Sequence, residues 1–577
     1  MKKLFSNFKY YKKEIVLAPL FKMLEALFEL FVPIVISNII DIGINGDGGK
    51  AYVIKMSLVL IALAIIGLLF AIFAQYFAAK AAVGFSKRTR SDLFKKMQSL
   101  SFSEIDKLGT SSMITRMTSD VNQVQNGVNL VLRLLLRSPI VVFGAIIMAF
   151  IVDAKSALVF AVEVPILSIV VFAIILTTIP MYKKVQHRLE DVLTKTRENL
   201  TGVRVIRAFS LEERENEEFI NRNRDLYVDQ KKVASISSLM NPLTYVIVNI
   251  AIVILIYVGA VRVNLGSLTQ GQVVALYNYM SQILIELIKL ANLIVNITKS
   301  IASGKRIESI LEMESSLKHI EGTKKESDYI VEFNHVDLCY NDGADNALED
   351  INFKVKKGQT IGIIGGTGSG KTSLVSLIPH FYDVKNGEVL VDGMNVQAYD
   401  DEKLREKIAI VMQRAVLFKG TIKDNIKWGK NDASDEEVLQ AINFAQASEV
   451  VSKKEEGINS VVEQLGKNFS GGQRQRLTIA RALVRKPEIL ILDDSSSALD
   501  YATDAKLRKS LKKLDYNPTV FIVSQRTSSI AHADKIVVLD DGKIDGIGTH
   551  EELLKSSKVY KEIYDSQFKK GGKSNEQ

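Results

Sequence analysis

The chain has 577 residues, which is too long for one ordinary domain and indicates at least two. Hydrophobic residues make up 47% and charged residues 24%, a balance too apolar for a disordered chain and too charged for one lying wholly in a bilayer. The single cysteine, Cys339, excludes a disulfide framework and paired-cysteine metal sites, while the net charge of +9 fits either nucleic-acid binding or basic loops beside a membrane.

Six long apolar segments precede residue 300, and each can cross the hydrocarbon core, which takes about 20 helical residues. We predict membrane-spanning helices at about 15–40, 52–82, 129–152, 156–182, 233–263 and 271–299. Because a soluble helical protein rarely contains so many segments of this kind, residues 1–312 are interpreted as an all-α transmembrane domain. The polar stretch 313–328 is interpreted as a linker.

The connections between these segments alternate between short and long. The two long ones, after the second and fourth segments, carry many basic residues, among them Arg88, Arg90, Arg188 and Arg204. The positive-inside rule therefore predicts that both termini and both long connections are cytoplasmic. Because the long connections are polar, lack proline and contain few glycines, we predict that they continue the spans as long cytoplasmic helical extensions.

Several ionisable residues fall inside the apolar segments, where charged groups normally face a cavity or pair with one another. They are Lys22, Glu25, Glu29, Glu163, Glu286 and Lys289. Two interpretations stay open: a polar substrate pathway, or self-neutralised pairs in cytoplasmic parts of the helices. Glu163, which has no neighbour of opposite charge at helical spacing, is the best candidate for a group that lines a cavity.

The first chemically informative motif in the second part of the chain is a glycine-rich loop. The predicted strand Thr360–Ile364 runs into the sequence GGTGSGKT, which fits the phosphate-loop pattern G-x-x-x-x-G-K-[ST]. In such a loop backbone amides surround phosphate oxygens, the lysine reaches the β- and γ-phosphates, and the hydroxyl after it coordinates Mg²⁺. The predicted ATP-binding residues are Gly365, Gly366, Thr367, Gly368, Ser369, Gly370, Lys371, Thr372 and Ser373.

A second motif supports this interpretation. Four apolar residues followed by Asp493, in the segment Ile489–Asp493, predict a buried strand whose terminal carboxylate holds Mg²⁺ through water. With Thr372, this makes Asp493 part of the expected metal site. The sequence thus predicts an α/β P-loop NTPase domain at 329–570, followed by a short C-terminal tail at 571–577.

Between these motifs lies the sequence NFSGGQRQR, which resembles the signature of ATP-binding cassette (ABC) transporters. Physically it is an anion site, because a serine and backbone amides meet at a helix N-terminus. The resemblance covers essentially the whole chain and implies an exporter half-transporter, whose signature contacts the γ-phosphate of ATP bound to the opposite cassette. The residues that it assigns to this role are Phe469, Ser470, Gly471, Gly472 and Gln473.

The resemblance implies further roles, residue by residue. Tyr340 would stack on adenine, and Gln413 would contact Mg²⁺. The loop that crosses between cassettes would consist of Ser497, Ala498, Leu499 and Asp500. The segments 103–120 and 198–219 resemble the two cytoplasmic loops of exporters, and the tip of the second would dock on the partner's cassette.

The chain departs from the family pattern at its catalytic positions. The family's general base is glutamate, where this chain has Asp494, a side chain shorter by one methylene. The switch position, normally histidine, is Gln525, whose amide cannot become a cation. Glu463-Gln464-Leu465-Gly466 also replaces the usual Gly-Glu-Arg-Gly before the signature. These departures predict a chain that binds ATP and Mg²⁺ but hydrolyses slowly at its own site.

The expected function is therefore one subunit of a heterodimeric ABC exporter in the inner (plasma) membrane, which moves amphipathic compounds outward through the lipid bilayer. Its signature would complete the catalytic site of a homologous half-transporter. A homodimer with slow ATPase at both sites, a lipid or peptide exporter, and an ATP-gated channel or regulatory subunit remain alternatives. We expect no nucleic-acid partner, because the basic excess lies at membrane-flanking loops rather than along the soluble half.

Overall fold

The computed structural model describes residues 2–340 and 345–568, which form two compact units. One unit lies within Met1–Gln98 and Thr110–Met313, and the other within Ser99–Gly109 and Glu314–Gln577. The predicted tail, 571–577, lies outside the described residues. The predicted domain ends stay predictions, and the structure groups Ser99–Gly109, which the sequence placed in the membrane part, with the second unit.

Among its described residues, the first unit contains helices joined by short loops and turns, and no strands. Its helices are α1 (Lys2–Ser6), α2 (Lys12–Asn38), α3 (Gly49–Gln98), α5 (Thr110–Thr115), α6 (Val121–Leu134), α7 (Arg137–Val152), α8 (Ala154–Thr201), α9 (Val203–Ala208), α10 (Glu212–Ser238), α11 (Met240–Asn264) and α12 (Gln270–Glu312), with short 3₁₀ or π turns between some of them.

Among the described residues, six helical stretches are long and apolar enough to cross a membrane. They are Leu4–Ile44, Gly49–Gln98, Thr110–Val152, Ala154–Thr201, Glu212–Asn264 and Gln270–Glu312. Each contains one of the six spans expected from the sequence, so the six-helix prediction is confirmed. The core of this unit joins α2, α7, α8, α11 and α12 through residues such as Leu30, Phe160, Leu255 and Tyr279.

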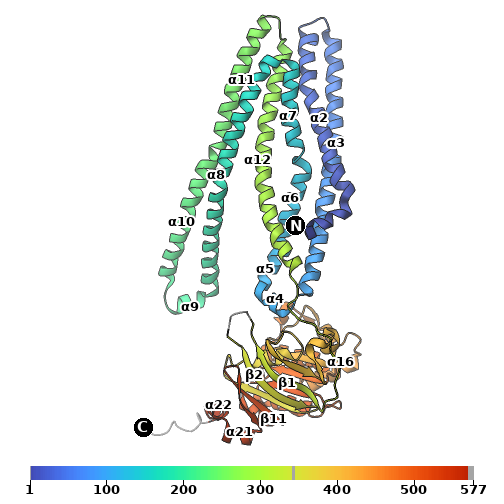
Figure 1. Cartoon of the computed structure of the whole chain (residues 1–577), viewed down its shortest axis with the longest axis vertical. Coiled ribbons are helices and arrows are strands. Elements are labelled where there is room, and N and C mark those ends of the chain that lie inside the picture. Colours follow the sequence, from blue (N-terminus) through green and yellow to red (C-terminus); the bar gives the residue numbers. More distant parts are fainter. Residues whose placement is uncertain (1, 341–344, 569–577) are drawn as a thin grey trace. The chain divides into compact units, whose positions relative to one another are not determined.

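The helices also extend well past the apolar segments, as predicted. Helix α3 contains 50 residues, and at 1.5 Å per residue it is about 75 Å long, whereas the hydrocarbon core is about 30 Å thick. Helices α8 and α10 lie side by side as a long hairpin that closes at α9 (Figure 1). The polar sequence of α10 gives no reason for it to enter lipid, which fits a helix that continues outside the membrane.

The second unit is built on β-sheets flanked by helices. Its strands are β1 (Tyr329–Leu338), β2 (Leu348–Lys356), β3 (Thr360–Gly365), β4 (Asn386–Val391), β5 (Met394–Asn395), β6 (Ile408–Val411), β7 (Gly420–Thr421), β8 (Val461–Val462), β9 (Ile489–Asp493), β10 (Thr519–Val523), β11 (Lys535–Asp540) and β12 (Lys543–Gly548). Its helices are α4 (Phe102–Leu108), α13 (Lys371–Leu377), α14 (Asp401–Lys407), α15 (Ile422–Lys427), α16 (Asp435–Phe444), α17 (Ser448–Ser452), α18 (Gly471–Leu483), α19 (Tyr501–Leu511), α20 (Thr527–Ile530), α21 (His550–Ser556) and α22 (Lys558–Phe568).

The larger sheet has the strand order β12-β11-β3-β10-β9-β6, and all its neighbours are parallel except β11 and β12. The central strand β10 pairs with β3 on one side and β9 on the other, so Val523 lies beside both Ile363 and Asp493. The carboxyl ends of these three strands therefore meet at one edge, which is where open α/β sheets bind ligands. The predicted α/β architecture is confirmed.

Helix α4 is separated from the rest of the second unit by more than two hundred residues of sequence, yet it packs within that unit. Its N-terminus is closed by a capping box between Ser101 and Glu104, which satisfies two backbone amides. The Phe102 ring lies 4.4 Å from the Phe381 ring, centroid to centroid. The first predicted cytoplasmic loop thus contacts the segment that follows α13.

Candidate active site

The loop between β3 and α13 has the shape of a phosphate cradle. Gly368 and Gly370 have φ angles of +86° and +89°, in the left-handed region that favours glycine. A Cβ at Gly370 would also come within 2.8 Å of the carbonyl oxygen of Ala347, so a larger residue would not fit. Because the loop turns directly into α13, its backbone amides converge at the start of that helix and can donate to an anion.

The side chain of Lys371 folds back over this loop. Its Nζ lies 3.1 Å from the carbonyl oxygen of Gly365 and 3.3 Å from the Ser369 hydroxyl, and it also donates to the Gly366 carbonyl. Burial lowers the pKa of the Lys371 ammonium more than the nearby carboxylates of Asp493 and Asp494 raise it. A half-buried cation held over a nest of amides is suited to bind phosphate oxygens.

Thr372 and Asp493 face each other at the same edge. The Thr372 hydroxyl donates to the Asp493 carboxylate over 3.1 Å, although the two residues come from different motifs. Asp493 is 2% exposed, and burial, together with the charge of Asp494, raises the pKa of its carboxyl group. The Thr372 hydroxyl, the buried Asp493 carboxylate and the half-buried Asp494 carboxylate offer the oxygen ligands that Mg²⁺ prefers, so these residues fit the expected ion.

Asp494 follows at the end of β9 with a φ angle of +45°. The amide Nε2 of Gln413 lies 3.4 Å from the Asp494 carboxylate, so the structure brings these two predicted site residues together. Burial raises the pKa of the Asp494 carboxyl group against the opposing effects of Gln413 and the Lys371 charge. A carboxylate whose proton affinity is raised in this way is suited to accept a proton from water.

Gln525 follows β10 and is exposed, and its backbone carbonyl accepts a hydrogen bond from Gln567 over 2.7 Å. The next residue, Arg526, was not singled out from the sequence. Its guanidinium donates to the carbonyl oxygens of Ser497 (3.4 Å) and Leu499 (3.2 Å). Arg526, next to the switch position, thereby contacts the predicted crossing loop. No short sequence motif predicts this contact.

The signature residues begin α18. Ser470 caps the helix and forms a capping box with Gln473, which fixes the first turn, while Phe469 is buried beneath it. A Cβ at Gly471 would meet open space, whereas one at Gly472 would lie 2.9 Å from the carbonyl oxygen of Ala498. Among the described residues, no hydrogen bond joins these signature residues to the chain's own phosphate loop.

The crossing loop lies beside Asp494 as well. The Ser497 hydroxyl donates to the backbone carbonyl of Asp494 over 2.8 Å, and Asp500 caps α19 by accepting from the Thr503 amide. Ala498 of this loop thus lies beside Gly472 in the signature helix, and Ser497 lies beside Asp494 at the base position. Their crossing to another cassette stays a prediction.

Tyr340 lies beside the start of α13, directly after the phosphate loop. Its hydroxyl donates to Ser373 over 2.8 Å, its ring is edge-on to Tyr382 at 5.0 Å, and the residue is 39% exposed. An aromatic face next to the loop can stack on a base. The stacking role stays a prediction.

The charges in the apolar helices gather around a residue that the sequence analysis did not single out, Arg137 at the start of α7. Its guanidinium forms ion pairs with Glu29 (2.6 Å) and with Glu286, and Ser138 donates to Glu286 over 2.8 Å. The expected pairs also form, with 2.6 Å between Lys22 and Glu25 and 2.8 Å between Lys289 and Glu286. The expected pairing is thus confirmed, while the position of these pairs relative to the membrane and their part in a substrate pathway stay predictions.

Glu163 in α8 behaves differently. It is 3% exposed, and in the described part of the chain neither carboxylate oxygen has a hydrogen-bond partner. Buried polar groups in membrane helices are costly unless a partner or a cavity compensates them. Its role in a substrate pathway stays a prediction.

Comparison with known proteins agrees with this arrangement. Residues 15–287 match the family described as the ABC transporter transmembrane region, and residues 348–497 match the family described as ABC transporter. The chain is 37% identical to the Bacillus subtilis protein described as the uncharacterized ABC transporter ATP-binding protein YfiB, over 99% of each chain. It is 33% identical to the putative multidrug export ATP-binding/permease protein YgaD of the same species, over 98% of each.

More distant relatives share the architecture. The ATP-dependent lipid A-core flippase of Escherichia coli is 29% identical over 97% of this chain and 96% of that protein. A solved structure of a bacterial Atm1-family ABC exporter with ATP bound superposes with a TM-score of 0.80 at 22% identity, over 98% of this chain and 99% of that one. At that identity the likeness shows the fold.

Proposed function

The chain belongs to the ABC transporter family, and from that membership we propose that it is one subunit of a heterodimeric exporter of amphipathic compounds. The single observation that carries the proposal is the contrast within its cassette: the phosphate loop and signature are intact, while the base position holds Asp494 and the switch position holds Gln525. A chain of this kind binds nucleotide at its own loop and contributes its signature to another site.

Binding of MgATP uses residues that the structure brings together. The loop amides and Lys371 hold the phosphates, Thr372 and Asp493 hold Mg²⁺, and Gln413 stands beside the base position. The Mg²⁺ ion, when bound, offsets charge on the phosphates. Tyr340 supplies the aromatic surface for the base.

Hydrolysis at this loop is slow for a geometric reason. Asp494 is held near Gln413 and carries one methylene fewer than the glutamate implied by the family resemblance, so its oxygens fall short by about 1.5 Å, a displacement that can cost about a hundredfold in rate. Gln525 cannot take up a proton as an imidazole can. The productive site is therefore the one completed by this chain's Ser470 and Gly471, whose backbone is open to a second cassette.

Transport follows from the fusion of six spans to one cassette in a single chain, an arrangement shared over nearly full length with a relative named as a putative multidrug exporter. The protein lies in the inner (plasma) membrane with both termini and the cassette in the cytoplasm, as the basic loops favour. Closure of two cassettes on ATP draws the long helical hairpins together and opens the pathway outward.

The test is restoration of the two altered residues in the chain purified alone. We expect low MgATP turnover in this form, and an increase of about tenfold or more in the double variant Asp494→Glu/Gln525→His. Gln567→His serves as a control, because it adds an imidazole near the same edge without occupying the switch position. High turnover of the unaltered chain alone, in a form verified as a homodimer, would contradict the proposal.

A further inference from the structure

In the polar linker before β1, the residues on both sides of His319 form backbone hydrogen bonds with the rest of the second unit. The backbone amide of Lys318 donates to the Asp383 carboxylate over 2.8 Å, and the amide of Ile320 donates to the carbonyl oxygen of Gln397 over 3.1 Å. Between these anchors, His319 is exposed, and its ring lies edge-on to the ring of His380, 5.8 Å away. The linker thus presents one imidazole to another.

His380 is completely buried, with 0% of its side chain exposed, in the turn after α13. Its Nε2 lies 2.9 Å from a carboxylate oxygen of Asp383, and its Nδ1 lies 3.2 Å from a carboxylate oxygen of Asp401. A neutral imidazole has one N–H and one lone pair, so it can donate to only one of these two carboxylates. The other contact requires a second proton or a cation between nitrogen and oxygen.

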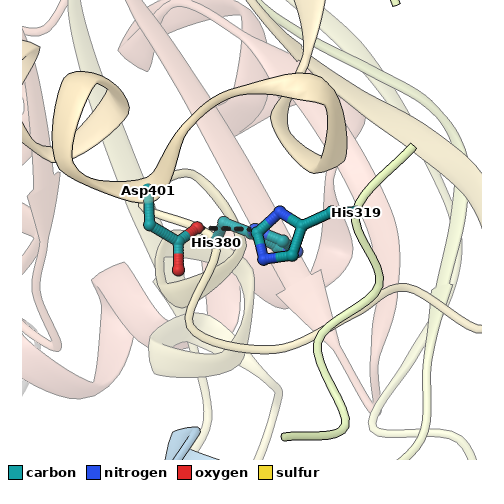
Figure 2. A group of neighbouring side chains, drawn as sticks. All are labelled: His319, His380 and Asp401. Atoms are coloured by element: carbon teal, nitrogen blue, oxygen red, sulfur yellow. Dashed lines mark hydrogen bonds and ion pairs between the residues drawn. The ribbon is translucent and has the colours of Figure 1, made fainter. Parts of the chain in front are cut away.

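We propose that the cation is a zinc ion bound by His319, His380 and Asp401. Ligand atoms of these three side chains all lie within 4.8 Å of one another, and Figure 2 shows them converging from three separate segments. Two imidazole nitrogens and one carboxylate oxygen form a ligand set typical of Zn²⁺, with water as the fourth ligand. No other group of three such side chains converges in this way among the residues that the structure describes.

The surroundings of His380 match those of a metal-bound histidine. A ligating imidazole usually donates its other N–H to a carboxylate, which fixes the tautomer and raises the basicity of the ligand nitrogen. Asp383 is placed for this role at Nε2, and it is held there because its carboxylate also accepts hydrogen bonds from the Gln397 amide and the Lys318 backbone amide. Nδ1 is then left with its lone pair toward Asp401.

Distances fit zinc with one small adjustment. Ligand atoms at about 2.0–2.1 Å from a tetrahedral ion lie about 3.3 Å apart, and the His380–Asp401 contact is already 3.2 Å. Asp401 is held from its other side by Arg405, whose guanidinium lies 3.2 Å from the second carboxylate oxygen. His319 is the ligand that must move inward, and it is free to do so because its side chain is exposed.

Bound zinc would clamp the linker to the unit next to the surface that receives α4. His380 is followed directly by Phe381 and Tyr382, which contact Phe102 and Asp106 of α4. The ion would therefore hold the start of the linker and the α4 contact in one arrangement. This inference does not depend on the proposed export function.

The experiment uses the full chain in lipid nanodiscs, purified with a tag that lacks histidine, stripped with a chelator, and then incubated with Zn²⁺ and freed of unbound metal. We expect one Zn²⁺ per chain by elemental analysis, with a Kd on the order of micromolar or tighter in competition with a chromophoric chelator. His319→Ala should weaken binding by about tenfold or more without harming the fold, because the residue is exposed. His319→Cys, which keeps a zinc ligand, should restore binding.

The matched control is His335→Ala, which removes another exposed histidine of the same unit, paired with Asp350 at 2.6 Å, and should leave zinc binding unchanged. In a second readout, zinc should slow tryptic cleavage at Lys318, Lys324 and Lys325 in the unaltered chain and not in His319→Ala. Substoichiometric zinc, or equal binding by the unaltered chain and His319→Ala, would overturn the proposal.

Discussion

The hydroxyl of Tyr382 donates a hydrogen bond to the carboxylate of Asp106, with 2.8 Å between the two oxygens. Tyr382 is also edge-on to Tyr340, whose own hydroxyl donates to Ser373 in the first turn of α13, directly after the phosphate loop. A continuous set of contacts therefore runs from α4 to the nucleotide site. Burial and the neighbouring carboxylate raise the pKa of Tyr382, so the phenol stays protonated and keeps donating at neutral pH.

Removing this hydroxyl should uncouple ATP turnover from transport. Tyr382→Phe loses a hydrogen bond to a charged acceptor, a loss of about 1.5–3 kcal/mol, while its ring can keep the aromatic contacts. We expect substrate export by the assembled transporter to fall about tenfold while basal ATPase changes by less than about twofold. Tyr399→Phe is the control, because its hydroxyl bonds to the Val391 carbonyl and not to α4. Equal loss of both activities in Tyr382→Phe would argue against coupling through this contact.

Adding a carboxylate to the signature should lower the ATPase rate far more than removing the carboxylate of Asp494. In Gly471→Asp the new side chain enters open space at the first turn of α18, where a negative charge suits the helix, so the chain should still fold. In the proposed dimer this carboxylate would face the γ-phosphate of ATP bound by the second cassette, so it should cost several kcal/mol and nearly abolish ATPase. Asp494→Asn should lower turnover by about threefold.

The two variants are compared as complexes with the proposed second half-transporter, by ATPase rate at saturating MgATP. Gly471→Ser, which adds a side chain without charge, separates electrostatic repulsion from bulk. If Asp494→Asn abolished turnover while Gly471→Asp spared it, this chain's own phosphate loop would be the productive one.

The ionised carboxylate of Asp494 should lower the free energy of unfolding of the nucleotide-free protein. Its pKa is raised by burial, so between the unfolded and folded pKa values the folded chain binds more protons, and stability falls as pH rises through that window. Asp494→Asn should therefore raise the melting temperature at pH 7 by about 2 °C. The gain should vanish as pH is lowered below about 3.9, where the carboxyl is protonated in both states.

The opposite sign is expected for Asp392→Asn. Ion pairs with Lys324 (2.6 Å) and Lys407 (2.9 Å) outweigh burial and lower the pKa of the Asp392 carboxyl group. That variant should melt lower than the unaltered chain at pH 7, and the deficit should shrink as pH falls through the lowered pKa. Both variants are compared in chelator-containing buffer by intrinsic fluorescence, and a loss of stability in Asp494→Asn at pH 7 would contradict the linkage.

In the helical unit, Arg137, Glu29 and Glu286 form an ion-pair cluster, and substitutions within it should have coupled effects on stability. Arg137→Met leaves Glu286, whose side chain is 4% exposed, without its guanidinium partner, which should cost about 3 kcal/mol. The double variant Arg137→Met/Glu286→Gln should recover much of this loss, giving a favourable coupling energy in a double-mutant cycle. Melting temperatures in nanodiscs provide the measurement. Glu163→Gln is the control: it removes a carboxylate without a hydrogen-bond partner, so the melting temperature should not fall. If the effects of the Arg137 and Glu286 substitutions were additive, the two residues would not be energetically coupled.

Local sequence patterns determined the parts of this protein that depend on neighbouring residues. The six spans could be predicted because membrane crossing needs a continuous apolar stretch, and the phosphate loop because its glycines, Lys371 and Thr372 are adjacent in sequence. The strand ending in Asp493 was recognisable for the same reason. Even the pairs Lys22–Glu25 and Glu286–Lys289 followed from helical spacing.

Only the tertiary structure decided which distant groups meet. Arg137 joins Glu29 and Glu286 across three helices, Asp106 reaches Tyr382, and His319 faces His380 and Asp401. None of these contacts leaves a periodic or short-range signal, because each depends on how whole elements pack. The free energy of a buried charge or imidazole is set by its spatial neighbours, and sequence separation carries little information about them.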